Sequence, residues 1–256
     1  MYTEKVKEYL IHHLSLVKGR HVQSLIDYKV GIQLVISHWV ESPSWNHAVI
    51  YKNDLLSEEI IQIEKTFELI GRRPAFYIVD QLQRETAHHF GALGYQLFDT
   101  EFWMGFDVKN EKPFSDSKVD LFQVLNDEGI HSFLQGFELG FSSLEVGYLR
   151  QLYLSLINNS EFQTKGIHYF ATMDGLPVGV ASCYFDNSVA GIYNLAVSQP
   201  YQGMGIGKKI IAGLISEAKK HGCKYFFLQA DYKSRNFYAK LGFEPLFEGN
   251  IHVKMI

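Results

Sequence analysis

Apolar residues recur with two different periods in the second half of the chain, and together they predict a strand, a helix and a second strand. The run Ile192–Val197 is short and mostly apolar, as expected of a buried strand. From residue 206 to residue 221, apolar side chains return every three or four positions, which predicts an amphipathic helix with a buried face of Ile206, Ile210, Ile211, Leu214, Ile215 and Ala218. Gly222 is typical of a helix end, and Tyr225–Ala230 predicts the second strand.

The loop between the first strand and the helix contains three alternating glycines, Gly203, Gly205 and Gly207. Glycines at this spacing remove side chains from the turn, so that several backbone N–H groups converge on one anion. The positive end of the following helix dipole points at the same place. The loop therefore predicts a pyrophosphate site, although a tight strand-to-helix connection without a ligand remains open.

Two common phosphate-binding loops do not fit this spacing. A P-loop needs a glycine five residues before its Gly–Lys pair, and Gln202 occupies that position. The dinucleotide fingerprint needs a third glycine three residues after the second, where this chain has Lys208 or Ile210. Neither a P-loop nor a dinucleotide fold is therefore expected.

The remaining pattern, Gln202-x-x-Gly205-x-Gly207 after a Leu-Ala-Val strand, resembles the coenzyme A motif of the GNAT superfamily of N-acetyltransferases. Farther along, Tyr238 stands four residues before Gly242-Phe243, which resembles the second signature of that family. The two matches have the order and separation that the family shows. They imply that the second half of the chain binds acetyl-coenzyme A (acetyl-CoA).

The resemblance implies a fold and a set of coenzyme contacts. The fold is α/β (α+β), with a mixed, mostly antiparallel sheet flanked by helices. Backbone groups of the strand would bind the pantetheine arm, and amides of the loop would bind the pyrophosphate. The implied cofactor residues are Leu195, Ala196, Val197, Gln202, Gly203, Met204, Gly205, Ile206, Gly207, Lys208, Asp231 and Ser234. Asp231 departs from the family, which usually has Asn there, and Ser234 replaces a usual Ala.

Tyr238 is the residue that the resemblance places closest to the chemistry. A phenol with a pKa near 10 is close to the thiol in acidity, so we expect Tyr238 to act as the general acid that protonates the leaving thiolate. A role in packing alone remains open. Cys183 lies in an apolar strand and is expected to be inert, which favours direct transfer over an acyl-enzyme.

The general base and the acceptor are not readable from the sequence. The strand before the loop carries no acid, and the possible contacts of an amine or a water are Tyr193, Asn194, Glu145, His168, Asp174 and Asp186. In the family, early helices wall the acceptor pocket. We therefore take Glu138, Glu145 and Tyr148 as candidate substrate residues, and we add Tyr193 from the strand before the loop.

The first half shows a faint repeat of the second. A strand at His47–Tyr51, a helix capped by Ser57 and a strand at Ala75–Val79 occur in the same order, and Leu93-Gly-Tyr95 parallels Leu241-Gly-Phe243. We expect two tandem domains, a degenerate copy at residues 1–110 and an acetyltransferase domain at residues 117–256. The loop of the first copy has no glycine and three acids, which would repel a pyrophosphate. One coenzyme site per chain follows, and the first copy would shape the acceptor site or mimic a dimer partner.

Composition and charge restrict the partners and the location that we expect for the protein. A net charge of −4 without a basic tract argues against nucleic-acid binding. No apolar run approaches a membrane span, the N-terminus lacks a signal peptide's apolar region, and two distant cysteines form neither a disulfide framework nor a metal motif. We expect a cytoplasmic monomer or homodimer without a metal, acting on the amine of a small molecule or peptide. A non-catalytic acyl-CoA sensor and a transferase of longer acyl groups remain open.

Overall fold

The computed structural model describes residues 8, 24–37, 40–52, 54–79, 90–110, 119–140, 150, 166–186 and 188–255. The chain divides into two compact units. Unit 1 comprises Met1–Met104, Gln229–Lys240 and Glu244–Ile256, and unit 2 comprises Gly105–Leu228 and Leu241–Phe243. Among the described helices, none is long and apolar enough to cross a membrane.

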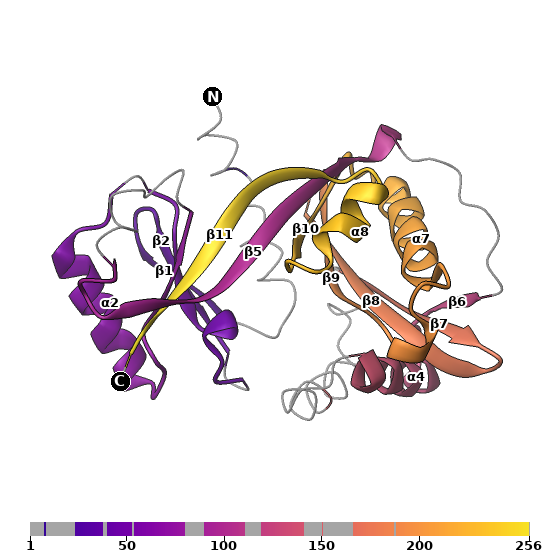
Figure 1. Cartoon of the computed structure of the whole chain (residues 1–256), viewed down its shortest axis with the longest axis horizontal. Helices are drawn as coiled ribbons and strands as arrows, with labels where there is room; N and C mark the ends of the chain where they lie inside the picture. The colour runs from indigo at the N-terminus through magenta and orange to yellow at the C-terminus, as the bar shows by residue number, and fades with distance from the viewer. Residues whose placement is uncertain are drawn as a thin grey trace. The chain divides into compact units, whose positions relative to one another are not determined.

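Unit 1 is built on a mixed sheet with the strand order β1-β2-β3-β4-β11-β5 (Figure 1). Its elements are β1 (Ser24–Lys29), β2 (Ile32–Ile36), η1 (Pro43–Trp45), β3 (His47–Ile50), α2 (Ser57–Leu69), β4 (Ala75–Ile78), β5 (Tyr95–Asp107), α8 (Arg235–Lys240) and β11 (Glu244–Lys254). Strands β1, β2 and β3 pair antiparallel, as do β4 and β11. Strands β3 and β4 are parallel, and α2 forms the crossover that a parallel pair requires.

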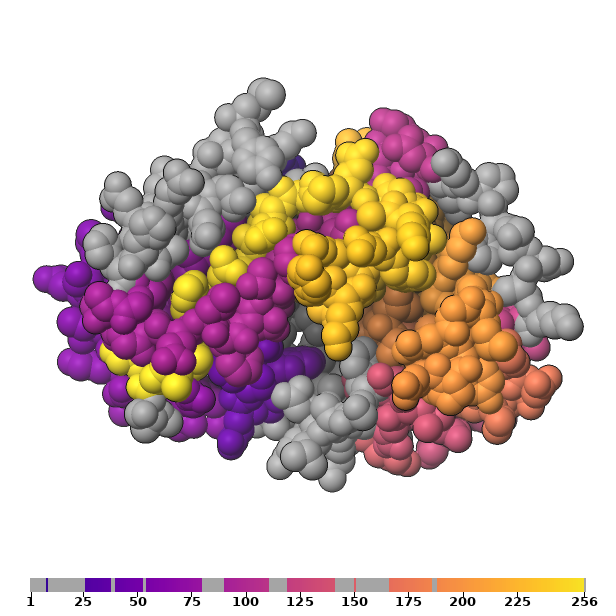
Figure 2. All heavy atoms as spheres, in the orientation of Figure 1, coloured from indigo at the N-terminus to yellow at the C-terminus, as the bar shows by residue number. Residues whose placement is uncertain are grey.

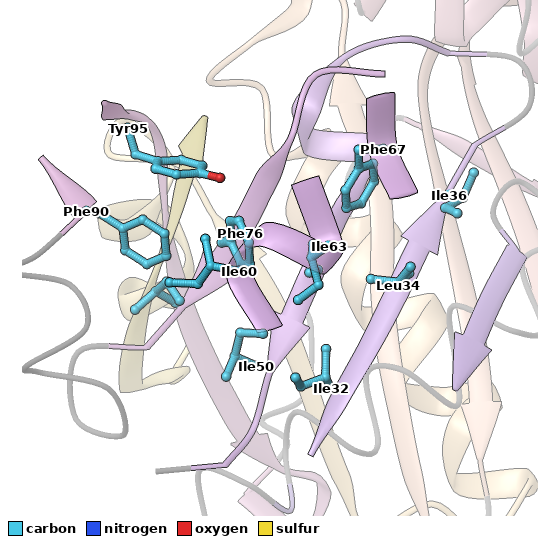
Figure 3. Packing of buried hydrophobic residues seen from close by; sticks show 12 residues of the cluster. Ile32, Leu34, Ile36, Ile50, Ile60, Ile63, Phe67, Phe76, Phe90 and Tyr95 are labelled. Atoms are coloured by element: carbon cyan, nitrogen blue, oxygen red, sulfur yellow. The ribbon is translucent and has the colours of Figure 1, made fainter. Parts of the chain in front are cut away.

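Helix α2 covers one face of this sheet with apolar side chains. Ile60, Ile63 and Phe67 lie on one side of α2 and pack against alternate residues of the strands beneath (Figure 3). The buried cluster contains Ile32, Leu34, Ile36, Ala48, Ile50, Ile60, Ile63, Phe67, Phe76, Ile78, Phe90 and Tyr95. Burial of each large apolar side chain contributes roughly 1.5–3 kcal/mol, so this face contributes substantially to the stability of unit 1.

Unit 2 is built on a second part of the sheet, in which the end of β5 is followed by β10-β9-β8-β7-β6. Its elements are η2 (Val108–Asn110), β6 (Asp120–Gln123), α4 (Asp127–Gly140), β7 (Gly166–Met173), β8 (Leu176–Asp186), β9 (Val189–Val197), η3 (Gln199–Tyr201), α7 (Ile206–Lys220) and β10 (Tyr225–Ala230). Gly136 of α4 approaches Val180, whereas Ile206 of α7 approaches Gly179. Because neighbouring strand residues face opposite sides, α4 and α7 cover opposite faces of β8 (Figure 1).

The two units repeat one arrangement. In unit 1, β2 and β3 pair antiparallel and α2 connects β3 to the parallel strand β4. In unit 2, β8 and β9 pair antiparallel and α7 connects β9 to the parallel strand β10. The predicted fold class, α/β (α+β) with a mixed, mostly antiparallel sheet flanked by helices, is confirmed.

The last strand of the chain belongs to unit 1. Strand β11 pairs with β4, with Asn250 opposite Ile78 and Val253 opposite Ala75. For this reason the compact units cut the chain differently from the expected domains 1–110 and 117–256. The expected domains follow the internal sequence repeat, whereas the compact units group residues that lie close together in space. The expected division therefore stays a prediction.

The packing of β11 on β4 predicts the effect of one substitution. An added Cβ at Gly249 would overlap Oη of Tyr77, which is buried and accepts a hydrogen bond from Nε1 of Trp103 at 2.5 Å. We expect Gly249→Ala to lower the free energy of unfolding by about 1–3 kcal/mol, because the Tyr77 ring must move. Urea unfolding measures the change.

Gly91→Ala is the matched control, because an added Cβ there meets nothing within 4 Å. Its effect should stay within about 0.5 kcal/mol. Equal stability of the two variants would contradict the close approach of β11 to Tyr77.

Candidate functional site

Strand β9 carries a β-bulge just before the glycine loop. Its register with β8 places Tyr193 opposite Ser182 and Ala196 opposite Val180, so two residues of β9 oppose the single residue between those on β8. Asn194 takes up the extra residue with a φ of 54°, in the left-handed region that Asn tolerates better than most residues. A bulge bends its strand and re-aims backbone groups, and it is common next to active sites.

Strand β9 pairs with its other neighbour, β10, over only part of its length. The parallel register of β9 with β10 runs from Val189 opposite Tyr225 to Gly191 opposite Phe227, whereas β9 continues to Val197. The stretch beyond Gly191 therefore lies outside this ladder. It includes Leu195, Ala196 and Val197, the residues predicted to meet a pantetheine arm, and Leu195 and Val197 are partly exposed.

The loop after β9 depends on two left-handed glycines. Gly203 has a φ of 83° and Gly205 a φ of 82°, and an added Cβ at either position meets nothing within 4 Å. Gly205 is the N-cap residue of α7, and its carbonyl accepts the first helical hydrogen bond, from Lys209 N at 3.0 Å. The first N–H groups of a helix point outward from its N-terminus and attract anions. Open space and outward donors together form a cradle of backbone groups.

Hydrogen bonds and packing hold the cradle in place. Ser198 N donates to Val178 O at 2.9 Å, and Gln202 Nε2 donates to Val197 O at 3.0 Å, which ties the loop to the end of β9. Gln202 therefore stabilises the loop through its side chain. Met204 and Lys208 are exposed beside it.

Helix α7 sits close to β8 because Gly179 has no side chain. An added Cβ at Gly179 would lie 3.1 Å from Ile206 and 3.1 Å from Ile210, closer than ordinary packing. Helix α7 lies at the surface of unit 2, where its atoms are drawn in orange (Figure 2), and residues on its outer side such as Lys208 and Lys219 are exposed. Gly179 was not among the predicted site residues, although an isolated glycine in an apolar strand is a signal for such close approach.

Asp231 and Ser234 lie in unit 1 and contact each other. Oδ1 of Asp231 accepts hydrogen bonds from N and from Oγ of Ser234, each at 2.6 Å. Partial burial opposes ionisation of Asp231, but the Ser234 hydrogen bonds outweigh it and hold the pKa of the carboxyl below its usual range. The carboxylate thus stabilises the turn that leads into α8. This role explains how the chain accommodates Asp at this position.

Tyr238 is buried in α8, with the Phe237 ring centroid 5.1 Å from its own. Burial, together with the charge of Asp231, raises the pKa of Tyr238 well above its usual value. The phenol therefore keeps its proton and gives it up less readily than the sequence argument assumed. This is compatible with hydrogen-bond donation, and it makes complete proton transfer more costly.

The predicted substrate residues have different surroundings. Glu138 is on the exposed side of α4 and forms an ion pair with Arg150 Nη1 at 2.8 Å. Tyr193 is buried, with its ring 5.6 Å from that of Tyr184 in an edge-on contact. Glu145 and Tyr148 lie outside the described residues. The structure thus assigns side-chain contacts to two of the four candidates.

The structure explains the surroundings of three further residues, the candidates His168 and Asp174 and the cysteine Cys183 that was expected to be inert. His168 is buried with Nδ1 2.8 Å from Ser182 Oγ, and burial lowers the pKa of His168 to about 3, which makes it a weak base at neutral pH. Burial raises the pKa of the Cys183 thiol well above its usual value, as expected of an inert core cysteine. Asp174, with a φ of 51°, precedes Gly175 in the tight turn between β7 and β8.

In unit 1, the helix that corresponds to α7 is α2, and a carboxylate of α2 itself lies at its N-terminus. Oε2 of Glu59 accepts hydrogen bonds from Leu56 N at 2.9 Å and from Lys52 Nζ at 2.5 Å. Leu56 is the N-cap residue and Ser57 begins the helix, so the prediction that Ser57 caps α2 is wrong. The reason is that the carboxylate of Glu59 already accepts the Leu56 N–H.

Comparisons with known proteins agree with this geometry. Residues 131–243 match the acetyltransferase (GNAT) family. Over the whole chain, the fold is similar to a GCN5-related N-acetyltransferase from Kribbella flavida, with a TM-score of 0.72, 15% identity, and coverage of 97% of this chain and 95% of that one. At this identity the likeness concerns the fold.

Two other solved structures share the fold. A functionally unknown conserved protein from Staphylococcus epidermidis has a TM-score of 0.69 and 14% identity, over 91% of this chain and 94% of that one. A tandem GNAT protein from the clavulanic acid biosynthesis pathway has a TM-score of 0.63 and 14% identity, over 91% of this chain and 83% of that one.

Gly205→Glu tests the cradle directly. The new carboxylate would fill the open space and repel an anion, so we expect the thermal shift produced by acetyl-CoA to disappear. The left-handed backbone costs the variant about 1–2 kcal/mol of stability in addition. Differential scanning fluorimetry with and without acetyl-CoA separates the two effects.

Gly175→Glu is the control, because Gly175 has a φ of 79° and an added Cβ there also meets nothing within 4 Å. It should lose a similar amount of stability and keep the full acetyl-CoA shift. A normal shift in Gly205→Glu would contradict the assignment of the loop.

Proposed function

Because residues 131–243 form an acetyltransferase domain of the GNAT family, we propose that the protein transfers an acetyl group from acetyl-CoA to the primary amine of a small molecule or peptide. The observation that carries this proposal is the backbone cradle, in which two left-handed glycines and the start of α7 leave open space beside outward-pointing N–H groups. Such donors do not titrate and are in place before the ligand arrives.

The coenzyme would bind along β9 and the loop. Amides from Gly203 to Lys208 would bind the pyrophosphate, assisted by the dipole of α7. Backbone groups of Leu195, Ala196 and Val197 would bind the pantetheine arm, because the β9–β10 ladder has ended before they begin. Gln202 would act through the loop that its side chain ties to Val197.

The chemical step we propose is direct attack. The neutral amine nitrogen attacks the thioester carbonyl, the carbon–sulfur bond breaks, and the extra proton on nitrogen passes to water. Tyr238 would donate a hydrogen bond or its proton to the departing sulfur. Since the pKa of Tyr238 is raised, hydrogen-bond donation to the thiolate is the less costly of the two contributions.

The proposal includes two tandem domains with one coenzyme site. Residues 117–256 would form the acetyltransferase domain and residues 1–110 a degenerate copy. The Glu59 carboxylate supports this division, because it occupies the helix start of the first copy and is paired with Lys52. The first copy would then shape the acceptor site or act in place of a dimer partner.

A second candidate is a sensor that binds an acyl-CoA without turnover. The raised pKa of Tyr238 favours it, since a poorer acid slows thiolate departure. A broad panel of primary amines separates the candidates. Release of free thiol with any amine supports the transferase, and coenzyme binding without release supports the sensor. Substituting octanoyl-CoA for acetyl-CoA in the same assay tests a longer acyl donor.

Tyr238→Phe tests the proposed acid. Removal of the hydroxyl should lower turnover by about 10-fold or more while leaving the affinity for acetyl-CoA nearly unchanged. Thiol release under saturating acetyl-CoA gives the turnover, and a calorimetric titration gives the affinity.

Tyr232→Phe removes a hydroxyl from an exposed tyrosine in the segment before α8 and should keep full activity. If Tyr238→Phe turns over as fast as this control, Tyr238 has no part in the chemistry.

A further inference from the structure

A lysine near the start of α7 ties that helix to β6, the strand that ends the order of the described sheet in unit 2. Lys209 is partly buried, and its Nζ donates a hydrogen bond to the backbone carbonyl of Val119, the residue before β6. Val119 is almost fully buried, and a buried carbonyl needs a donor. A hydrogen bond from an ammonium group is charge-assisted and therefore stronger than a neutral one.

The same side of α7 contacts β6 again one turn later. Gly213 follows Lys209 by four residues, so the two residues share one side of the helix. An added Cβ at Gly213 would lie 2.5 Å from Cδ2 of Leu121 in β6, which is closer than ordinary packing. The absence of a side chain at Gly213 thus lets α7 lie directly against β6, and the lysine and the glycine hold two successive turns of the helix on this strand.

Lys209 also belongs to the cradle through its backbone. Its N–H donates to Gly205 O at 3.0 Å, and this bond closes the first turn of α7. The side chain of Lys209 therefore connects β6 to the turn whose outward N–H groups form the cradle. Adjacent helix residues point about 100° apart, so Lys208 and Lys209 face different directions although they are neighbours in the sequence.

We propose that Lys209 is a positioning residue for the coenzyme, and that it acts by anchoring the first turn of α7 to β6 without contacting the phosphates itself. The inference rests on the proposed function for the identity of the ligand, and it adds β6 to the elements that set the cradle. Contact with Gly179 of β8 determines how closely α7 approaches the sheet, and the Lys209 anchor determines the direction of its first turn. Amides that are held in this way need little rearrangement when the coenzyme binds.

Lys209→Met removes the donor and keeps the apolar stem of the side chain. In the protein without coenzyme, we expect faster hydrogen exchange at the amides of residues 209–211, which close the first turns of α7, and unchanged exchange at residues 216–220 near its end. Exchange that becomes faster at both ends alike would show a general loss of stability and would overturn the inference. Unchanged exchange at residues 209–211 would overturn it as well.

Acetyl-CoA binding is the second measurement. The dissociation constant from calorimetry should rise about 5-fold or more in Lys209→Met, because the cradle amides are no longer held in place. Lys209→Arg keeps a cationic donor and should bind acetyl-CoA within about 3-fold of the wild type. If Lys209→Arg binds as weakly as Lys209→Met, the hydrogen bond to Val119 is not what positions the cradle.

Lys220→Met is the matched control, because Lys220 is also a lysine of α7 and its Nζ donates to Glu217 Oε1 at 2.5 Å. It removes one charge and one side-chain hydrogen bond at the other end of the helix. We expect it to leave both the exchange at residues 209–211 and the affinity for acetyl-CoA unchanged. Effects as large as those of Lys209→Met would contradict the special role of the contact with β6.

The two measurements separate failure of the inference from failure of the proposed function. Equal acetyl-CoA affinity in the wild type and Lys209→Met supports the function and overturns the inference. Weaker binding by Lys209→Met without faster exchange in the coenzyme-free protein indicates a direct phosphate contact, and it also overturns the inference. Absence of acetyl-CoA binding to the wild type overturns the proposed function, whereas faster exchange at residues 209–211 in Lys209→Met would still support the anchor on β6.

Discussion

The ladder between β8 and β9 holds β9 along its length, whereas the ladder between β9 and β10 ends at Gly191, and the candidate site depends on this difference. The stretch of β9 beyond Gly191 keeps its position because β8 pairs with it, and the bulge at Asn194 re-aims its backbone. The contact of α7 with Gly179 then sets where the helix begins. Backbone donors fixed in this way need little reorganisation when an anion binds.

The parts of the fold that depend on neighbouring residues were predictable, whereas the parts that depend on strand pairing were not. The helix predicted over residues 206–221 is observed at Ile206–Lys220, and the strand Tyr225–Ala230 has the predicted bounds, because apolar periodicity and Gly222 act locally. The bulge at Asn194 was not predictable, since it arises from register with β8 rather than from residues nearby. Pairing of β11 with β4 joins segments that are far apart in the sequence, and no local pattern encodes such a choice. The glycine loop was readable because left-handed backbone demands glycine.

The two strand–helix–strand arrangements differ at the N-terminus of the helix, where an anion would bind. In unit 2, left-handed glycines precede the helix and leave space open beside its N-terminus. In unit 1, the carboxylate of Glu59 accepts the Leu56 N–H and pairs with Lys52, so the helix carries its own anion. One backbone arrangement thus supports an internal cap in one unit and a candidate ligand site in the other.

Hydrogen exchange with and without acetyl-CoA tests the central claim most directly, because the claim concerns backbone amides. The account predicts that acetyl-CoA slows exchange in residues 195–208 and leaves residues 52–59 unchanged. Unchanged exchange in residues 195–208 at saturating acetyl-CoA, or protection confined to residues 52–59, would contradict it.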